Sequence, residues 1–450
     1  MEIIQSIFGF FIAIGILVTF HEFGHFYIAR LFNVKVLNFS IGFGKTLYKK
    51  KFNNEGTEYS VGLIPLGGYV KMLESSELDP DLDKDKHPYC FEKQSVYKRF
   101  LIVAAGPVFN LILAIIFFTI VHFSGITGMK PFVTSIDGHN LPQIEGKSFH
   151  EIVEVNGVMT QRWQDVRVEI LNIIVNKNKL NLLVKDYKNE TSLLQINYDK
   201  NILQRDGDIV VNLGLHPRKP EFPSTIGTIE NNSPASLSGL KIGDRVFSVN
   251  NQAIDSWNGL VEKIQNNANN ILKLKIDRSG EILDIILVPA TNKNSSNQSG
   301  YAGISPDQTE LNNFRILVKY PFFESFYKST LLTYDYSILT FKMIFELFTG
   351  QANMKNISGP LSIAEFSGKS LSMGFVYFAY LLAILSISLG VLNLLPIPLL
   401  DGGHLVYYML EMLTGNPVSE KFQLVAQQVG MLILFSIMIV AFYNDFARLL

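Results

Sequence analysis

The stretch His21-Glu22-Phe23-Gly24-His25 directly follows an apolar run, Ile3–Phe20, which is about long enough to cross a bilayer as a helix. Residues four apart on a helix share one face, so His21 and His25 are expected to point the same way. Ionisable side chains at a membrane helix are costly to hold there and mark a functional site by default. The fold therefore begins with a membrane helix that carries polar side chains at its end.

Three further apolar stretches have the length of a membrane span, roughly Phe100–Phe123, Phe375–Leu400 and Leu424–Tyr443. The composition agrees, because 48% of residues are hydrophobic and only 18% are charged, against about 25% charged in soluble proteins. No basic residue precedes the first span, so we expect a retained helix rather than a cleaved signal peptide. A weaker segment, Phe322–Phe348, carries charged residues that include Lys328, Asp335, Lys342 and Glu346, and it is typical of an amphipathic helix at the membrane interface.

Charge and cysteine content exclude several classes. The formal net charge is −1, from 39 Lys and Arg against 40 Asp and Glu, so nothing indicates a nucleic-acid partner. The single cysteine, Cys90, excludes an intramolecular disulfide and a zinc site built from four cysteines. The expected partners are membrane lipid and other membrane proteins.

The topology follows from the positive charges near the span ends, which mark cytoplasmic loops. The loop between the first two spans holds a basic cluster: Arg30, Lys35, Lys45, Lys49, Lys50, Lys51, Lys71, Lys93, Lys98 and Arg99. This loop is therefore placed inside the cell, together with the short tip between the third and fourth spans. Both termini and residues from about 125 to 369 are placed outside, and the His21 end of the first span lies near the cytoplasmic side.

The outer region is predicted to be β-rich and contains a repeat at an offset of 94 residues. Residues 151–157 align with 245–251, and the only two tryptophans, Trp163 and Trp257, each follow the aligned asparagine by seven residues. Each copy reads as a strand, an Asn-led turn and a helix. Residues 232–245 before the second copy hold a Pro-Ala…Gly-Leu…Gly-Asp run, which resembles PDZ domains of the permuted bacterial type.

The organisation that follows has five parts: 1–124 as N-terminal membrane core, 125–221 and 222–310 as PDZ-like domains, 311–370 as an interfacial segment, and 371–450 as C-terminal membrane core. PDZ domains bind an extended peptide at a sheet edge, but both domains are equally compatible with gating access to the membrane face. The Asn-rich tract Asn292–Gln298 is interpreted as a loop insertion.

The His-Glu-x-x-His pattern is the zinc signature of metalloproteases, in which two histidines bind zinc and the glutamate is the general base. Catalytic zinc usually has three protein ligands, so one is missing. The best candidate is Asp401, because Pro396 and Pro398 break the third apolar stretch and free the backbone to carry its carboxylate back toward the metal. The alternative is that Asp401 is only an N-cap for a helix that begins at Gly402.

Together, residues 21–25 and Asn393-Leu-Leu-Pro-Ile-Pro-Leu-Leu-Asp401-Gly-Gly403 resemble the site-2 protease family of intramembrane zinc metalloproteases. Residues 42–45, 63–71 and Ala105–Asn110 match it as well, so the resemblance covers nearly the whole chain. Four spans with two PDZ-like domains between the second and third are similar to the bacterial members that act in the sigma-E envelope stress response.

The resemblance implies residue roles. Zinc would be bound by His21, His25 and Asp401, and Glu22 would activate water. Substrate would be held by Asn393 and by a membrane-dipping β-hairpin that includes Gly42, Gly44, Gly67, Gly68 and Tyr69. A partner for the substrate backbone is also needed on physical grounds, because an unwound helix in lipid exposes N–H and C=O groups. The glycines are equally compatible with ordinary turns and bends.

The expected fold is an α-helical polytopic membrane protein with four transmembrane helices, a membrane-associated β-hairpin and two extracytoplasmic α+β PDZ-like domains. The expected function is a zinc endopeptidase of the bacterial inner membrane that cuts single-pass transmembrane proteins, by resemblance an anti-sigma factor and remnant signal peptides. Two other classes remain. A non-catalytic scaffold displaying PDZ domains has no use for Glu22, and a metal transporter needs ligands at several depths.

Overall fold

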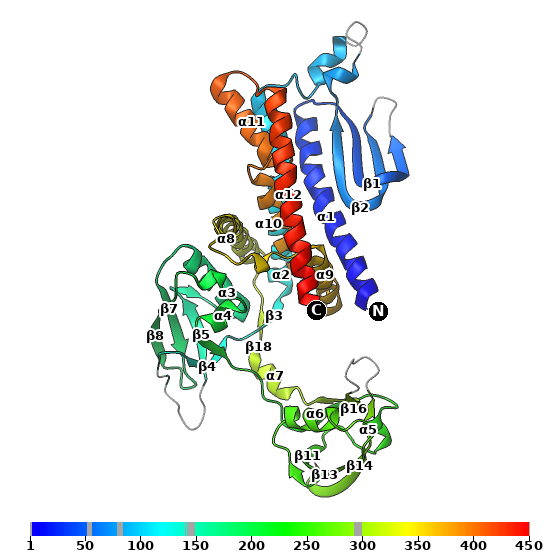
Figure 1. The fold of residues 1–450 in the computed structure, drawn as a ribbon, viewed down its shortest axis with the longest axis vertical. Helices are drawn as coiled ribbons and strands as arrows, with labels where there is room; N and C mark the ends of the chain where they lie inside the picture. The colour runs from blue at the N-terminus through cyan, green and yellow to red at the C-terminus, as the bar shows by residue number, and fades with distance from the viewer. Residues whose placement is uncertain are drawn as a thin grey trace.

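The computed structural model describes residues 2–51, 56–78, 84–139, 141, 149–291 and 299–449. The Asn-rich tract 292–298 lies outside the described residues. The chain forms a bundle of long helices, a β-sheet beside one end of the bundle, and two α+β units beyond the other end (Figure 1). Both termini lie at the end of the bundle that faces the two units.

Four helices are long and apolar enough to span a membrane. They are α1 (Glu2–Leu31), α2 (Val96–Ser124), α10 (Phe375–Leu394) and α12 (Glu420–Leu449). The four predicted spans are therefore confirmed as apolar helices, with two corrections to their bounds. α1 continues through the histidines to Leu31, so the metal-binding pattern lies inside a helix. α10 ends at Leu394 rather than Leu400, because prolines at 396 and 398 cannot continue it.

Small residues set the spacing between the central helices. A methyl group added to Gly24 of α1 would lie 2.5 Å from the carbonyl oxygen of Ala105 on α2. One added to Gly390 of α10 would lie 3.1 Å from the Pro107 carbonyl oxygen of α2. Such close approach is how membrane helices gain packing energy where the hydrophobic effect between them is weak. α2 consequently packs closely against both α1 and α10.

The sheet beside α1 consists of β1 (Val36–Lys51) and β2 (Glu58–Met72), each of which folds back on itself. β1 reverses at Gly42 and Gly44, whose φ angles of +87° and +84° favour glycine. Residues 38–41 pair with 68–71 on one side and with 58–61 on the other. The sheet is therefore broader than a simple hairpin, and it packs against α1 through both strands.

The two outer units share a run of two strands, a helix and two strands, and they differ in the elements on either side of it. The first contains β4 (Phe132–Ile136), β5 (His150–Val155), β6 (Val158–Met159), α3 (Trp163–Val175), β7 (Leu180–Lys185), β8 (Thr191–Ile196), α4 (Ile209–Asn212) and β9 (Leu215–Pro217). The second contains β10 (Ile226–Ile229), α5 (Pro234–Leu237), β11 (Arg245–Val249), β12 (Gln252–Ala253), α6 (Trp257–Gln265), β13 (Leu272–Arg278), β14 (Glu281–Leu287), β15 (Ala290–Thr291), β16 (Gly300–Tyr301) and β17 (Ile304–Pro306).

The aligned asparagines occupy the same place in both units. Asn156 and Asn250 have φ angles of 48° and 50° and begin the turn after β5 and β11. The side-chain oxygen of each accepts a hydrogen bond from a backbone N–H near the start of the strand after the helix, from Asn181 in β7 at 2.6 Å and from Lys273 in β13 at 2.9 Å. The 94-residue offset thus relates two turns with the same hydrogen bonding.

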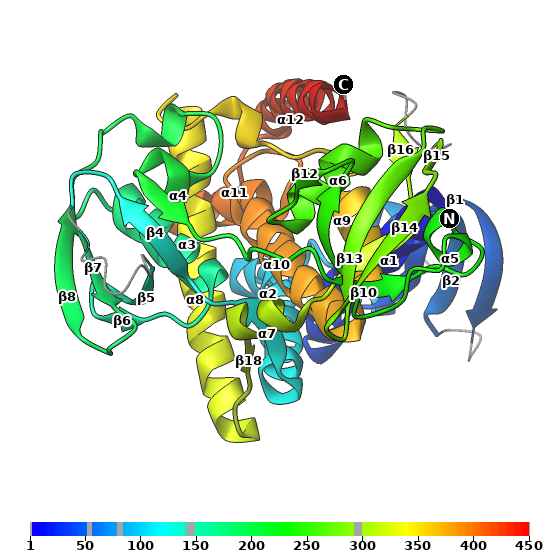
Figure 2. The ribbon, with the colours of Figure 1, turned by 90° about the horizontal axis from the view of Figure 1, so that it is seen from below.

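The remaining elements connect the units to the bundle. They are β3 (Ile126–Met129), α7 (Thr309–Phe314), β18 (Arg315–Val318), α8 (Phe322–Phe348), α9 (Pro360–Met373), α11 (Asp401–Thr414), and short 3-10 turns at Ser75–Glu77, Lys84–Tyr89, Ile202–Gln204 and Met354–Asn356. β3 pairs with β18, so the chain leaves and re-enters the bundle side by side. α8 lies across the direction of the spans (Figure 2).

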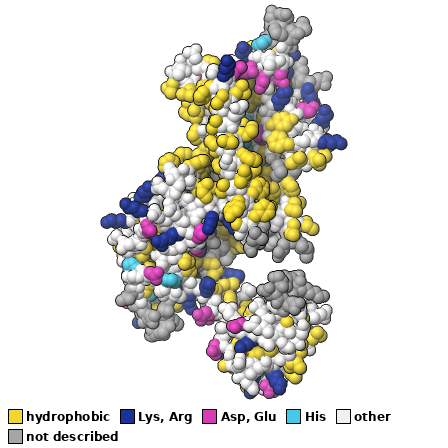
Figure 3. All heavy atoms as spheres, in the orientation of Figure 1, with side chains coloured by type: hydrophobic (Ala, Val, Ile, Leu, Met, Phe, Trp, Pro, Cys, Tyr) yellow, Lys and Arg dark blue, Asp and Glu magenta, His cyan; other side chains and the backbone are white. Residues whose placement is uncertain are grey.

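α8 has two different faces. Its buried side chains are mostly polar, and His122 of α2 hydrogen-bonds to Ser329 at 2.9 Å. Leu339 of α8 joins the core of the first unit. Its exposed side chains include Phe323, Tyr327 and Phe345. Hydrophobic side chains cover the bundle in the space-filling view, whereas charged side chains gather over the sheet end and the two units (Figure 3). An aromatic face between these zones is typical of the membrane–water boundary.

α12 is attached to the rest mainly at two points. Near its middle, a methyl group on Gly430 would overlap the Pro398 carbonyl oxygen at 2.0 Å. At its C-terminal end, the buried Asp445 carboxylate accepts hydrogen bonds from the backbone N–H groups of Gly359, Leu361 and Ser362 at the start of α9. Asp445 therefore caps a helix that is 83 or more residues away in sequence.

We predict that Asp445→Ala lowers the thermal unfolding temperature of the detergent-purified chain, because several N–H donors at the start of α9 lose their acceptor. The expected cost is about 1–3 kcal/mol. Glu365→Ala, which removes an exposed carboxylate on α9, is the control and should change stability by less than about 0.5 kcal/mol. Equal melting temperatures for the two variants would contradict the capping role.

Candidate metal centre

Two imidazoles converge from one face of α1. His21 and His25 are one helical turn apart, both are largely buried, and their Nε2 atoms lie 3.2 Å from each other. The predicted shared face is therefore present. Each ring presents Nε2 to the same point, while each Nδ1 is turned toward α2.

The Asp401 carboxylate reaches the same point from a distant segment. α10 ends at Leu394, and α11 begins at Asp401 after a short irregular stretch that contains Leu399 at a φ of 95°. The Asp401 Oδ2 atom lies 3.1 Å from His21 Nε2 and 3.5 Å from His25 Nε2. The alternative in which Asp401 caps the next helix is wrong, because Asp401 is the first residue of α11 and the capping position, Leu400, makes no side-chain hydrogen bond.

These three atoms fit a zinc ion. Ligands at 2.0–2.1 Å in a tetrahedron lie about 3.3 Å apart, and the three atoms here are separated by 3.1, 3.2 and 3.5 Å. The Asp401 Oδ2 atom is buried and has no hydrogen-bond partner of acceptable geometry among the described residues. A carboxylate oxygen and two imidazole nitrogens directed at one point are the donor set of a catalytic zinc site with one position left open.

α2 supports both histidines from behind. The His25 Nδ1 atom lies 2.9 Å from the Ile102 carbonyl oxygen, and the His21 Nδ1 atom lies 3.1 Å from the Asn110 side-chain nitrogen. Between them is Gly106, where an added methyl group would lie 2.3 Å from His25 Nε2 and 2.8 Å from His21 Cε1. The rings therefore occupy the space that a side chain at position 106 would need.

Glu22 lies between the histidines and the sheet. It is half-buried, and its carboxylate accepts a hydrogen bond from the backbone N–H of Val70 in β2. A methyl group at Gly68 would lie 3.0 Å from its Cγ atom. The sheet thus brings its backbone against the residue expected to handle protons.

The comparisons with known proteins agree with this geometry. The profile of peptidase family M50 matches residues 9–437. The chain belongs to this family. It is 36% identical to the protease RseP of Yersinia pestis over 100% of both chains. It is 35% identical to the regulator of sigma-E protease RseP of Escherichia coli K12 over 98% of both chains, and 34% identical to the regulator of sigma E protease of Haemophilus influenzae over 100% of both.

Membership of family M50 makes the chain a zinc metalloprotease of the site-2 type. Its four apolar helices and its β-sheets are those of a helical membrane-type protein. The candidate metal ligands lie on two segments some 380 residues apart in sequence, and both segments contact α2.

The residues expected to hold substrate lie in several places. Gly67 and Gly68 lie in the part of β2 that faces α1, and the Phe43 ring occupies the space beside Gly67. Tyr69 stacks on Phe43 with ring centres 6.4 Å apart, while Gly42 and Gly44 form the reversal of β1. Asn393 is in the last turn of α10, half-buried, and its amide makes no side-chain hydrogen bond to the described residues. In this set, Gly68 is the glycine at which an added methyl group would meet the Glu22 side chain.

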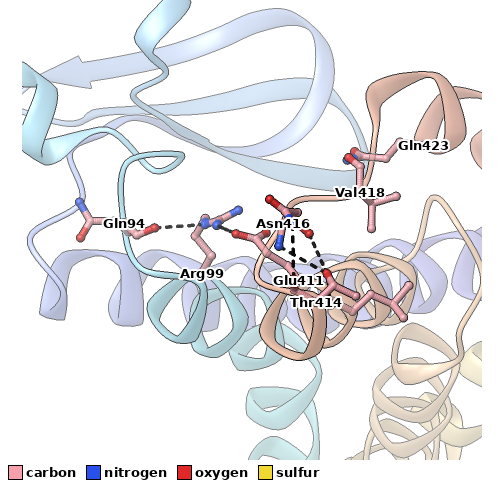
Figure 4. A network of polar contacts seen from close by, with 8 residues as sticks. Gln94, Arg99, Glu411, Thr414, Asn416, Val418 and Gln423 are labelled. Atoms are coloured by element: carbon pink, nitrogen blue, oxygen red, sulfur yellow. Dashed lines mark hydrogen bonds and ion pairs between the residues drawn. The ribbon is translucent and has the colours of Figure 1, made fainter.

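An ion pair connects α2 to α11 near the N-terminal end of α2. Arg99 of α2 donates to the Glu411 carboxylate of α11 at 2.6 Å, and its Nε atom donates to the Gln94 carbonyl oxygen at 3.2 Å (Figure 4). The guanidinium also lies over the Tyr408 ring at 5.0 Å. Both charged side chains are less than 20% exposed. Because α11 begins with Asp401, this pair holds the helix of the third candidate ligand against α2.

Sequence reasoning missed Asn110, Gly106 and the Arg99–Glu411 pair. Ala105–Asn110 was noted only as part of the family resemblance. A signal was available for Asn110, because it is an uncharged polar residue in the middle of an apolar span. Nothing in the sequence pairs Arg99 with Glu411, which are 312 positions apart.

We predict that Gly106→Ala lowers zinc affinity by about tenfold or more, because the methyl group displaces both imidazoles. Gly15→Ala is the matched control on α1, since a methyl group there meets nothing within 4 Å. Zinc content of the purified chains after dialysis against a graded chelator measures the effect. Normal zinc retention by Gly106→Ala would show that the ligands do not lie against α2.

We also predict that Glu411→Gln destabilises the chain and weakens zinc binding, since Arg99 is left largely buried without its counter-charge. The double variant Arg99→Met/Glu411→Gln should recover part of the lost melting temperature, because no buried charge then remains. Thermal unfolding and zinc titration are measured on four proteins: the wild type, Arg99→Met, Glu411→Gln and the double variant. Additive effects of the two changes would rule out direct coupling.

Proposed function

We propose that this chain is an intramembrane endopeptidase that hydrolyses peptide bonds within transmembrane segments of single-pass proteins. In this proposal, His21, His25 and Asp401 hold zinc and Glu22 is the catalytic base. The observation that carries it is the triangle of donor atoms, with edges of 3.1–3.5 Å, beside the Glu22 carboxylate, which is not one of the three converging donors. A scaffold that only displays outer domains has no need for this arrangement.

The residues present divide the work of amide hydrolysis. Zinc held at this point would polarise the scissile carbonyl and lower the pKa of a water molecule toward 7. Glu22 would take the proton of the attacking water and deliver it to the leaving amide nitrogen. The hydrogen bond from Val70 N–H orients the Glu22 carboxylate and keeps one of its oxygens in place. Histidine rings held at Nδ1 limit movement of the ligands during the reaction.

Substrate would be held in extended form along the sheet. A helix must unwind locally before it is cut, and each unpaired backbone group in an apolar setting costs several kcal/mol. Residues 67–71 of β2, next to Glu22, supply strand backbone at the right place, and the Asn393 amide supplies a further donor and acceptor. In this proposal, the reversal at Gly42 and Gly44 shapes the end of the sheet that dips into the membrane.

The proposed setting is the bacterial inner membrane, with the active site near the cytoplasmic side and the two units in the periplasm. Two observations support it. The sheet that carries the Lys-rich segment 45–51 lies at the end of the bundle opposite the two units (Figure 1). Positive residues favour the cytoplasmic side. The aromatic face of α8 lies beside the first unit, where the opposite membrane interface would be.

We further propose that residues 125–221 and 222–310 are PDZ-like domains and that 311–370 is an interfacial segment. The shared element order and the matching Asn156 and Asn250 turns support a repeated domain. Peptide capture and steric gating are both open to such domains. Relatives are named for sigma-E regulation, so an anti-sigma factor is the proposed substrate, together with remnant signal peptides.

The test is cleavage of a membrane-anchored reporter in vesicles, with zinc measured on each protein. Glu22→Gln should keep zinc and lose at least about 100-fold in turnover, because proton transfer contributes about 10²–10⁴-fold. Asp401→Asn should lower both zinc content and turnover.

Glu346→Gln, at a buried carboxylate on α8 away from the metal centre, is the control and should retain activity. Reporter cleavage at the wild-type rate by Glu22→Gln would defeat the proposal and leave the scaffold reading standing. A transporter reading would be favoured instead if zinc crossed the vesicle membrane while the reporter stayed intact.

A further inference from the structure

Asn110 is a fully buried amide in the middle of α2 whose side chain has one hydrogen-bond partner among the described residues. Its exposed fraction is 0%, and its Nδ2 atom lies 3.1 Å from His21 Nδ1. Its Oδ1 atom is buried without a hydrogen-bond partner among the described residues. A buried amide left partly unpaired costs about 1–3 kcal/mol, so stability alone gives no reason for asparagine here. The hydrogen bond of this side chain is to His21, one of the candidate metal ligands.

The hydrogen bond to Nδ1 decides which nitrogen of His21 carries the proton. If the amide donates to Nδ1, the ring proton lies on Nε2, and Nε2 has no lone pair for a metal. If the amide oxygen instead accepts from Nδ1–H, the lone pair lies on Nε2, which is the atom directed at Asp401 and His25. Exchanging the oxygen and nitrogen of an asparagine amide leaves its heavy-atom positions unchanged, so both orientations fit the same coordinates.

His25 provides the comparison within the same site. Its Nδ1 faces the Ile102 carbonyl oxygen at 2.9 Å, and a carbonyl can only accept. His25 therefore carries its proton on Nδ1 and presents a lone pair at Nε2. Zinc ligands commonly have their second ring nitrogen held in this way by a carbonyl or carboxylate. Among the described residues, no backbone carbonyl hydrogen-bonds to His21 Nδ1, and Asn110 occupies that place.

We propose that Asn110 is a positioning residue whose Oδ1 accepts a hydrogen bond from His21 Nδ1–H, which fixes the tautomer that presents Nε2 to zinc. The inference rests on the metal site of the proposed function. This arrangement requires no change in net charge. It requires only that the Asn110 amide is turned so that its oxygen, and not its NH₂ group, faces His21 Nδ1. In this orientation the NH₂ group points to the side of the amide that has no hydrogen-bond partner among the described residues. The hydrogen bond to His21 is therefore the interaction that determines which way the amide is turned.

The experiment compares zinc affinity among size-matched variants of the full-length chain in detergent, by competition with a chromogenic chelator. Asn110→Leu removes the acceptor and should weaken zinc binding by about 10–100-fold. Asn110→Asp keeps an acceptor and removes the donor, so its zinc affinity should equal or exceed that of the wild type. Ser386→Ala is the matched control, because Ser386 donates to the backbone oxygen of Asn110 at 2.7 Å and does not touch the amide.

Two readouts separate positioning from folding. The melting temperature without zinc reports the structural cost of each variant, and the ¹⁵N shifts of His21 report which ring nitrogen is protonated in the zinc-loaded chain. Protonated Nδ1 in wild type and Asn110→Asp is the expected result. Rescue by the aspartate cannot come from size alone, since leucine is similar in volume.

Each outcome decides something. Equal weakening by Asn110→Asp and Asn110→Leu would show that the amide donates, which overturns the positioning role while the zinc site stands. Unchanged affinity in Asn110→Leu would also overturn it. If the wild type and Ser386→Ala bind no zinc in stoichiometric amount, the proposed metal site fails, and this inference fails with it.

Discussion

The close contact between α1 and α2 is the constraint on which the metal centre depends. Gly24 lets α1 approach the α2 backbone, and Gly106 leaves room for the two imidazoles against α2. With larger residues at either position, the rings would turn away from the Ile102 carbonyl and from Asn110, and their Nε2 atoms would no longer meet. In a membrane, where apolar burial between helices yields little, such small residues are what makes this distance favourable.

α2 is also the common reference for the other segments. Asp401 comes from the opposite end of the chain, yet its helix is attached to α2 through Arg99 and Glu411. α10 packs on α2 at Gly390 and through the Ser386 hydrogen bond to the Asn110 carbonyl oxygen. A single helix thus contacts the segments that carry all three candidate ligands, which explains how atoms from distant parts of the sequence come within 3.1–3.5 Å of one another.

Local patterns were sufficient for the parts of the site that lie within one helix. The spacing of His21 and His25 determines a shared face wherever α1 lies, and Pro396 and Pro398 end α10 through their own backbone chemistry. Features that depend on how helices cross were not accessible. The pairing of Arg99 with Glu411 and the space beside Gly106 arise only after packing, and no local preference encodes them. The sequence also did not predict that β1 and β2 each fold back on themselves, although Gly42, where β1 reverses, is a candidate turn residue in the sequence.

The same reasoning explains why the first outer unit and the metal centre belong to one packed structure. Leu339 of α8 lies in the core of the first unit, and Ser329, three turns earlier on the same helix, hydrogen-bonds to His122 at the end of α2. α2 then runs without interruption from His122 to Asn110, which contacts His21. A rigid helix and two buried contacts therefore connect the outer unit to a metal-ligand candidate. Buried, close-packed contacts have few alternative arrangements. A displacement of α8 would therefore also displace α2, because the contacts between the two helices cannot rearrange to compensate.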